Sequence, residues 1–186
     1  YQYLGLTFTN NQIVAPQKGT FTTTGAAPTD STFTGRATIA SSQIKVQDEL
    51  GLMAFLGTSF NQGYVYLGAG PSVFKIQNNL DNVIGYADFN GIPSNVTGTP
   101  TNFSSSSWVW GGIAQLGMTY VFKPTWFLDI NYTYAITDKN STSYVKSFTN
   151  TSATTGYINQ GTLNGVASNR VIAQALIVSV NKLFPV

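Results

Sequence analysis

The sequence is poor in charge and lacks two of the most reactive side chains. Only 9% of its 186 residues are charged, whereas a typical soluble domain has about 25%. It contains no cysteine and no histidine. These absences exclude disulfides, thiol catalysis, Cys-based or His-ligated metal sites and a Ser–His–Asp triad. We therefore expect neither an enzyme nor a bound cofactor, because no general base with a near-neutral pKa is present.

Long apolar segments and basic clusters are also missing. The longest strongly apolar run, residues 171–180, is too short for a transmembrane helix, which needs about 20 residues. The net charge is only +2, and no basic patch suggests nucleic acid as a partner. The length predicts a single domain spanning residues 1–186.

The clearest pattern is an alternation over residues 108–138. Even positions from 108 to 122 carry mostly Trp, Leu, Met, Tyr and Phe, whereas odd positions include Gly, Gln and Thr. Residues 123–125 form a turn, and the alternation continues from Trp126. Aromatic residues gather near the ends of the apolar stripes. This arrangement predicts a hairpin whose strands cross a bilayer.

Alternation alone does not say which face points inward, because a soluble lipocalin-like barrel also alternates. Three features favour a lipid-facing apolar stripe over a soluble β-sandwich or barrel. The opposite stripe is small and polar, the strands are about 12–16 residues long where about 9–11 suffice, and short and long connections alternate. The predicted fold is an all-β, antiparallel up-and-down transmembrane barrel of eight strands. Its periplasmic turns lie at 61–63 and 123–125, and its extracellular loops at 80–105 and 139–166.

Residues 10–47 leave two interpretations open. They form either an extra hairpin or one long loop, because Thr-rich strands and Thr-rich loops have similar compositions and Pro16 disfavours a strand. Residues 1–9 are predicted to form a strand. Because the sequence starts inside this strand, further residues are expected before it. Additional strands are predicted at 49–60, 64–78 and 169–184.

Two stretches resemble known bacterial proteins. Residues 64–70 (YVYLGAG) resemble a strand common in small outer-membrane barrels. Residues 108–120 and 125–134 are similar to the penultimate hairpin of the OmpW and OmpA-like, opacity-type families. The chain end departs from their pattern, because Phe184 is followed by Pro185-Val186 and Lys182 replaces a second aromatic residue. The resemblance implies an eight-stranded barrel in the outer membrane of a Gram-negative bacterium.

Three groups of residues are candidates for a functional role. Arg36, Glu49 and Asp129 are predicted to face the lumen, either closing it as a paired network or acting as a polar relay. Lys75 and Arg170 are predicted at the extracellular rim, where they contact lipopolysaccharide phosphates or extend into the headgroup region. The expected interfacial aromatic girdle consists of Phe60, Trp108, Trp110, Phe122, Trp126, Tyr134 and Phe184.

Two functions fit this pattern. The first is a non-enzymatic surface barrel that anchors loops for envelope integrity, adhesion or host contact. Its partners are outer-membrane lipid, lipopolysaccharide and a host or envelope protein bound through the loops. The alternative, implied by the resemblance, is an OmpW-like channel for small hydrophobic solutes. The narrow lumen of an eight-stranded barrel, filled by side chains, counts against this alternative.

Overall fold

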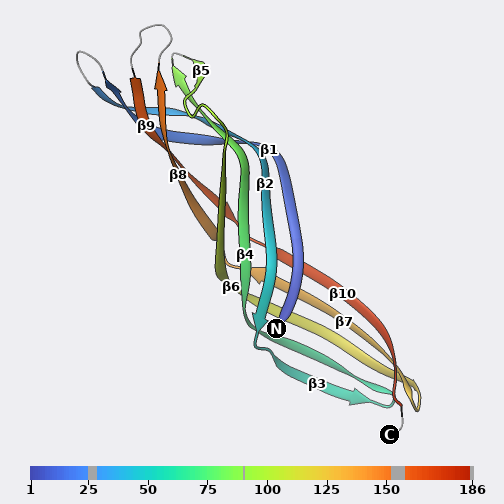
Figure 1. The fold of residues 1–186 in the computed structure, drawn as a ribbon. Coiled ribbons are helices and arrows are strands. Elements are labelled where there is room, and N and C mark those ends of the chain that lie inside the picture. Colours follow the sequence, from blue (N-terminus) through green and yellow to red (C-terminus); the bar gives the residue numbers. More distant parts are fainter. Residues whose placement is uncertain (25–28, 90, 152–157, 185–186) are drawn as a thin grey trace.

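The computed structural model describes residues 1–24, 29–89, 91–151 and 158–184. These residues form one antiparallel, up-and-down sheet of ten strands (Figure 1). No helix in the described ranges is both long and apolar enough to cross a membrane. The strands are β1 (Gln2–Thr24), β2 (Thr29–Gly51), β3 (Ala54–Phe60), β4 (Gly63–Phe89), β5 (Ile92–Asn95), β6 (Thr101–Lys123), β7 (Trp126–Thr137), β8 (Asn140–Thr151), β9 (Ile158–Asn169) and β10 (Ile172–Lys182).

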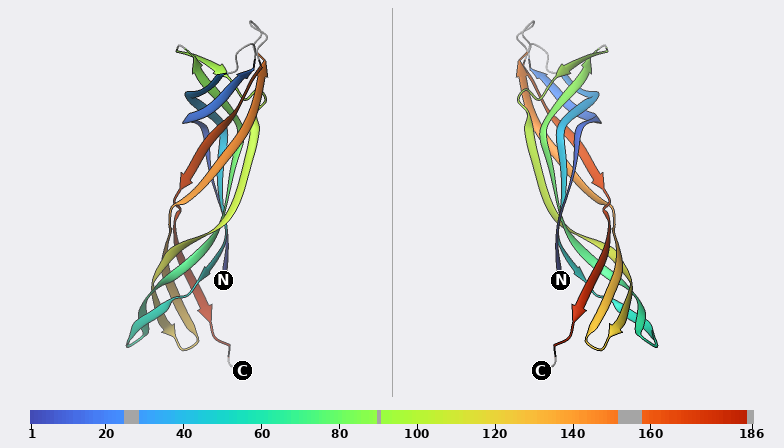
Figure 2. Two further views of the ribbon diagram at one scale, coloured as in Figure 1. Left: turned by 90° about the vertical axis from the view of Figure 1, so that its left-hand side faces the viewer. Right: turned by 90° about the vertical axis from the view of Figure 1, so that its right-hand side faces the viewer.

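Three pairs of consecutive strands are single long strands with a short break. The breaks are Leu52–Met53 between β2 and β3, 138–139 between β7 and β8, and 170–171 between β9 and β10. Backbone hydrogen bonds persist beside them: the Leu52 amide donates to Pro71 O at 3.0 Å, and the Thr137 amide to Val171 O at 3.0 Å. We call this level the waist, because the elongated molecule narrows there (Figure 2).

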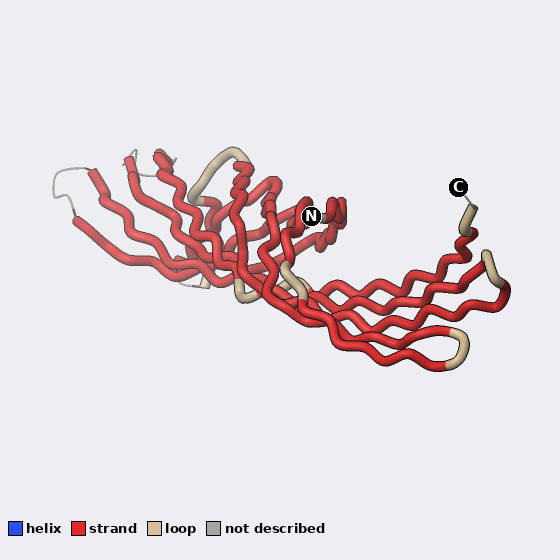
Figure 3. The backbone as a smooth tube through the Cα atoms, turned by 90° about the horizontal axis from the view of Figure 1, so that it is seen from below, coloured by secondary structure: helices blue, strands red, loops and turns tan. Residues whose placement is uncertain are grey.

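The lower half contains β3, the first part of β4, the second part of β6, β7 and β10. These five strands pair in the order β3-β4-β6-β7-β10. Seen from below, they form an open, curved sheet with the carboxyl end of the chain at one margin (Figure 3). β3 and β10 are its edges, and no ladder in the described ranges joins them. The predicted closed barrel of eight strands is therefore not found in these residues.

The upper half is built from β1, β2, the remainder of β4 and β6, and the β8–β9 hairpin. β1 pairs with β2 from Gln2↔Glu49 to Thr23↔Thr29, and with β9 only from Lys18 to Thr24. Gln12 and Asn82 have positive φ angles of 57° and 52°. Such a conformation is uncommon outside glycine and bends a strand locally.

The structure resolves one open question and corrects two predictions. Residues 10–47 mostly form the β1–β2 hairpin, apart from the undescribed residues at its tip. The predicted loops at 80–105 and 139–166 are largely strand, in β4, β5, β6, β8 and β9. Their Thr-, Ser- and Asn-rich composition suits strands with one face in water, so polarity alone does not distinguish them from loops.

The buried apolar residues gather at the waist and above it. The cluster at the waist comprises Val46, Phe74, Ile76, Val109, Ile113, Ala135 and Val171. Two smaller clusters lie higher, one around Leu80 and Tyr144 and one around Val96 and Phe148. The interior of the molecule is thus filled with apolar side chains at its narrowest level.

Candidate functional site: an apolar outer band and a polar interior

The apolar face of β4 changes sides at the waist. Below it, Val65 and Leu67 point outward and are 36% and 57% exposed. Above it, Phe74 and Ile76 point inward and are buried, and the outward positions are occupied by polar residues. Between these positions the side chains of β4 alternate regularly between the two faces, with no inserted residue. The kind of residue on each face therefore changes at the waist. The inward residues are Tyr64, Tyr66, Gly68, Gly70 and Ser72 below, then Phe74, Ile76, Asn78 and Leu80 above.

A continuous apolar row crosses the outside of the lower half. Leu56, Leu67, Leu116, Tyr132 and Leu176 are successive cross-strand partners on five neighbouring strands. They are 83%, 57%, 56%, 40% and 67% exposed. A contiguous apolar surface of this kind is rare on monomeric soluble proteins and marks contact with lipid or protein. We call the outward surface of the lower half the outer band.

The upper limit of the outer band lies at one level on two strands. Lys75 of β4 pairs with Trp108 of β6. Immediately above, the outward residues are Ser106 and Ser104 on β6 and Gln77 on β4, and Ser104 is hydrogen-bonded to Gln77 at 3.4 Å. The outward face therefore becomes polar within two residues.

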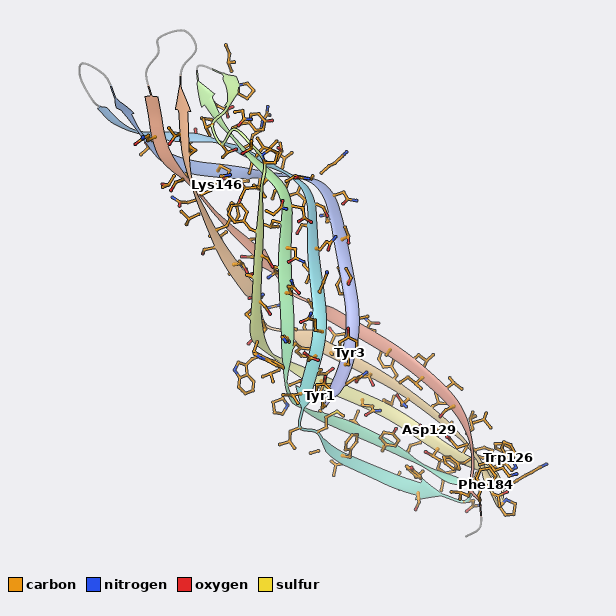
Figure 4. All side chains as sticks on the ribbon, in the orientation of Figure 1. Tyr1, Tyr3, Trp126, Asp129, Lys146 and Phe184 are labelled. Carbon is orange, nitrogen blue, oxygen red and sulfur yellow. The ribbon has the colours of Figure 1, made fainter. Side chains whose placement is uncertain are left out.

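The lower limit has the same pairing of lysine with aromatic rings. Lys182 pairs with Trp126 in register, and its Nζ lies 5.4 Å from the Trp126 ring centroid and 4.9 Å from that of Phe184. Trp126 and Phe184 lie together at the lower end of the molecule (Figure 4). Amphipathic rings beside a cation suit the headgroup region of a bilayer.

The separation of the two limits matches a bilayer. From Trp108 to Phe122 along β6 the backbone extends about 46 Å at roughly 3.3 Å per residue. With a tilt of about 45° this corresponds to about 33 Å along the membrane normal. An outer-membrane barrel has an apolar band about 25 Å high with an aromatic girdle on each side, so this height fits.

Six of the predicted girdle residues lie at or near these limits on the outside, whereas Tyr134 pairs with Ala114, about midway between Trp108 and Phe122. Six of the seven are exposed, and Tyr134 is half-buried. Interfacial anchoring is still a prediction for them. The exposed fractions are Phe60 43%, Trp108 52%, Trp110 65%, Phe122 46%, Trp126 36% and Phe184 73%.

The structure does not bring Arg36, Glu49 and Asp129 together. Arg36 is exposed on the outside of β2, because its neighbour Ala37 occupies the inward position. Along one strand, its distance from Glu49 is about 43 Å. Asp129 lies near the lower end of β7, where Thr119 Oγ1 donates to it at 2.8 Å (Figure 4). The expected network was wrong for Arg36, since above the waist the apolar stripe faces inward.

Glu49 is buried at the waist without a cationic partner in the described ranges. Its Oε1 accepts a hydrogen bond from Ser72 Oγ at 3.0 Å. The ion pair that the structure does describe joins Lys75 and Asp48, whose charged atoms are 3.8 Å apart on the outside. Glu49 thus has a hydrogen-bonded structural position beneath the apolar cluster.

Lys75 and Arg170 both lie near the upper limit of the outer band. Arg170 borders a cavity of about 250 Å³ together with Trp110 and Asp138. This placement, beside exposed tryptophans, is compatible with the expected headgroup contact. Binding of lipopolysaccharide by these residues is still a prediction.

A network of neutral polar side chains above the waist was not predicted. Asn169 Nδ2 donates to Asn78 Oδ1 at 2.7 Å, and Asn78 Nδ2 donates to Thr142 Oγ1 at 3.2 Å. Thr142 is also hydrogen-bonded to Ser105 at 3.1 Å. The network links β4, β6, β8 and β9, and so connects β6 to β8, between which the described residues form no ladder. The sequence gives no signal for this network, because its residues come from strands that are far apart in the chain and meet only when the strands pair.

The described residues include no group of three or more acidic, cysteine or histidine side chains able to hold a metal ion. Higher in the interior, burial raises the pKa of Tyr144, and the hydrogen bond that its hydroxyl accepts from Gln17 opposes this shift. At neutral pH the phenol is therefore uncharged, like the neutral polar network below it.

Comparison with known proteins gives little. No protein-family model and no curated protein matches the chain. The crystal structure of Neisserial surface protein A (NspA) is a weak structural neighbour, with 11% identity and a TM-score of 0.16. The match covers 88% of this chain and 98% of that protein. A TM-score this low supports no conclusion about fold or function.

Proposed function

We propose that the chain is a non-enzymatic outer-membrane protein whose lower half spans the membrane and whose upper half stands at the cell surface. The observation that carries this proposal is the change of apolar face at the waist. In lipid, a strand is most stable with its apolar side chains outward, and in water with them inward. Followed from the upper half to the lower half, the outward faces of β4 and β6 both change from polar to apolar at the level of Lys75 and Trp108.

Strand length supports the same division. β4 runs from Gly63 to Phe89, and about 9–11 residues suffice to cross a bilayer as a tilted strand. The part of β4 beyond Val73 therefore lies outside the membrane. There the outward residues are mostly polar, which suits contact with water, and most apolar residues pack inside. The upper half is then an extended surface structure, with a role in envelope integrity, adhesion or host contact.

The free edges of β3 and β10 have a consequence in this setting. Unpaired backbone N–H and C=O groups in hydrocarbon cost several kcal/mol each, so both edges need hydrogen-bonding partners in the membrane. β3 and β10 run in the same direction, since each lies an even number of antiparallel steps from the other. Closure by antiparallel pairing with both edges therefore needs an odd number of additional strands, the outer ones running opposite to β3 and β10.

The interior counts against a channel for small hydrophobic solutes. Phe74, Ile76 and Val46 are each at most 1% exposed and fill the waist. Passage through the tube requires these side chains to move apart. Surface display needs no such motion, and for this reason we prefer it.

The proposal is tested by measuring the depth of a tryptophan in lipid vesicles. The three native tryptophans are replaced by Phe, and one tryptophan is placed at Leu116 or, as the matched control, at outward-facing Val145 of the upper half. Lipids brominated deep in their chains should quench fluorescence strongly at position 116 and weakly at 145. Equal accessibility of both positions to aqueous acrylamide, in protein that stays soluble without detergent, would overturn the proposal.

A further inference from the structure

A cavity of about 340 Å³ lies inside the upper half, between the β1–β2 hairpin and the β8–β9 hairpin. Its walls include Ile13 of β1, Leu80 of β4 and Tyr144 of β8. It lies above the apolar cluster at the waist, and Asn169 of the polar network is part of its wall. The cavity therefore has a largely apolar wall, and Asn169 connects this wall to the polar network.

The cavity opens sideways between β1 and β9. The ladder between these strands runs from Lys18↔Asn164 toward the top of the molecule. Below that pair the two strands separate, and residues 8–15 of β1 face residues 166–169 of β9 across the cavity. Phe8 and Val166 flank the opening and are 44% and 65% exposed. A ligand can therefore enter from the side, without passing through the waist.

The lining defines the chemistry of the occupant. None of the described residues that line the cavity is charged, so a charged ligand would lose its hydration without an ionic partner there. The wall is apolar with a few neutral hydrogen-bonding groups, such as Asn10 and Ser42. This mixture is typical of sites for small organic ligands. Since a dry cavity of about 150 Å³ admits benzene, this volume suits roughly twice as many heavy atoms.

We propose that this cavity binds a small neutral amphiphile, with an apolar body of about ten carbons and one hydroxyl or amide group. The apolar body packs against Ile13 and Leu80, and the polar group faces the neutral side chains of the wall. Entry is lateral, between Phe8 and Val166. The site is separate from the outer band, so ligand binding there does not depend on whether the lower half inserts into a membrane.

The test uses a photoreactive straight-chain alcohol of about ten carbons that carries a diazirine, followed by mapping of the labelled residues. In folded protein in vesicles we expect adducts on residues 8–15 and 166–169. Leu116, on the outer band, serves as an internal reference, because a lipid-soluble probe also labels a lipid-facing position. Loss of the Leu116 adducts alone would therefore refute membrane insertion without refuting the cavity site.

Two variants fill the cavity from opposite walls. Ala167→Phe and Ala15→Phe should each lower cavity labelling by about tenfold or more, since losing contact with two buried methylene groups already has that effect. Val145→Phe, on the outside of β8, should leave it unchanged. Folding of each variant is verified by its mobility in SDS without heating. If one of the two variants does not fold, the other still provides the test. The proposal is overturned if cavity labelling persists in both variants. It is also overturned if a carboxylate analogue of the probe labels the cavity as strongly as the alcohol does.

Discussion

Replacing Leu116 by arginine separates a lipid-facing outer band from one that faces water. Leu116 is 56% exposed and lies near the middle of β6 between Trp108 and Phe122. At about 3.3 Å per residue and a tilt of about 45°, it is roughly 14 Å from the Phe122 limit. That depth is close to the centre of a bilayer.

The expected cost follows from this depth. Arginine on the lipid face costs about 2–4 kcal/mol at the midplane and about 0–1 kcal/mol near the interface. Leu116→Arg should therefore lower the folding equilibrium constant roughly 30- to 900-fold, because each 1.36 kcal/mol is a factor of ten. Phe122→Arg, at the lower limit, is the matched control and should cost much less.

The assay is reversible unfolding in guanidinium chloride from lipid vesicles, followed by tryptophan fluorescence. In water, an exposed substitution away from special features changes stability by about 0.5 kcal/mol or less. If both variants lie within that range of the parent, and Leu116→Arg improves solubility without detergent, the reasoning from the outer band fails.

Two further predictions concern the interior. Because burial raises the pKa of Tyr144, its contribution to stability should be complete below the unfolded value near 10 and lost as pH rises through the folded value; unfolding free energies between about pH 8 and pH 12 should decline less steeply in Tyr144→Phe. A Cβ at Gly70 would lie 1.8 Å from the Leu52 carbonyl oxygen, whereas one at Gly117 would lie 2.1 Å from the ring of Tyr66. The ring can swing away and the backbone cannot, so Gly70→Ala should cost more than Gly117→Ala, within about 1–3 kcal/mol, in the same unfolding assay.

The lower half was predictable from sequence because its pattern is local. The strands expected at 108–122 and from Trp126 onward fall within β6 and β7, and the turns near 61–63 and 123–125 are tight turns. Alternation shows that two faces differ, and large apolar residues opposite Gly, Thr and Asp predict which is apolar. Leu116 and Val178 are exposed, as expected of the apolar stripe.

The upper half was less predictable, because its strands resemble loops in composition. Residues 101–107 and 140–151 are mostly Ser, Thr and Asn; Ser and Asn are common in turns and loops, Asn is depleted in strands, and only Thr favours a strand. Asn82 has the positive φ typical of a turn, although it lies inside β4. Strand pairing over many residues outweighs these local signals, and pairing cannot be deduced from composition.

The location of Arg36 shows which information the alternation lacks. The pattern around it is regular, with Ala37 and Ile39 on one face and Arg36 on the other. Period-two alternation divides side chains between two faces but does not state what each face contacts. Below the waist the apolar residues face outward and the polar residues face inward. The same assignment above the waist would place Arg36 inside, whereas the structure exposes it. If the lower half lies in lipid and the upper half in water, as we propose, the surroundings of each half determine this orientation, and the change from Val73 to Lys75 on β4 marks the boundary between them.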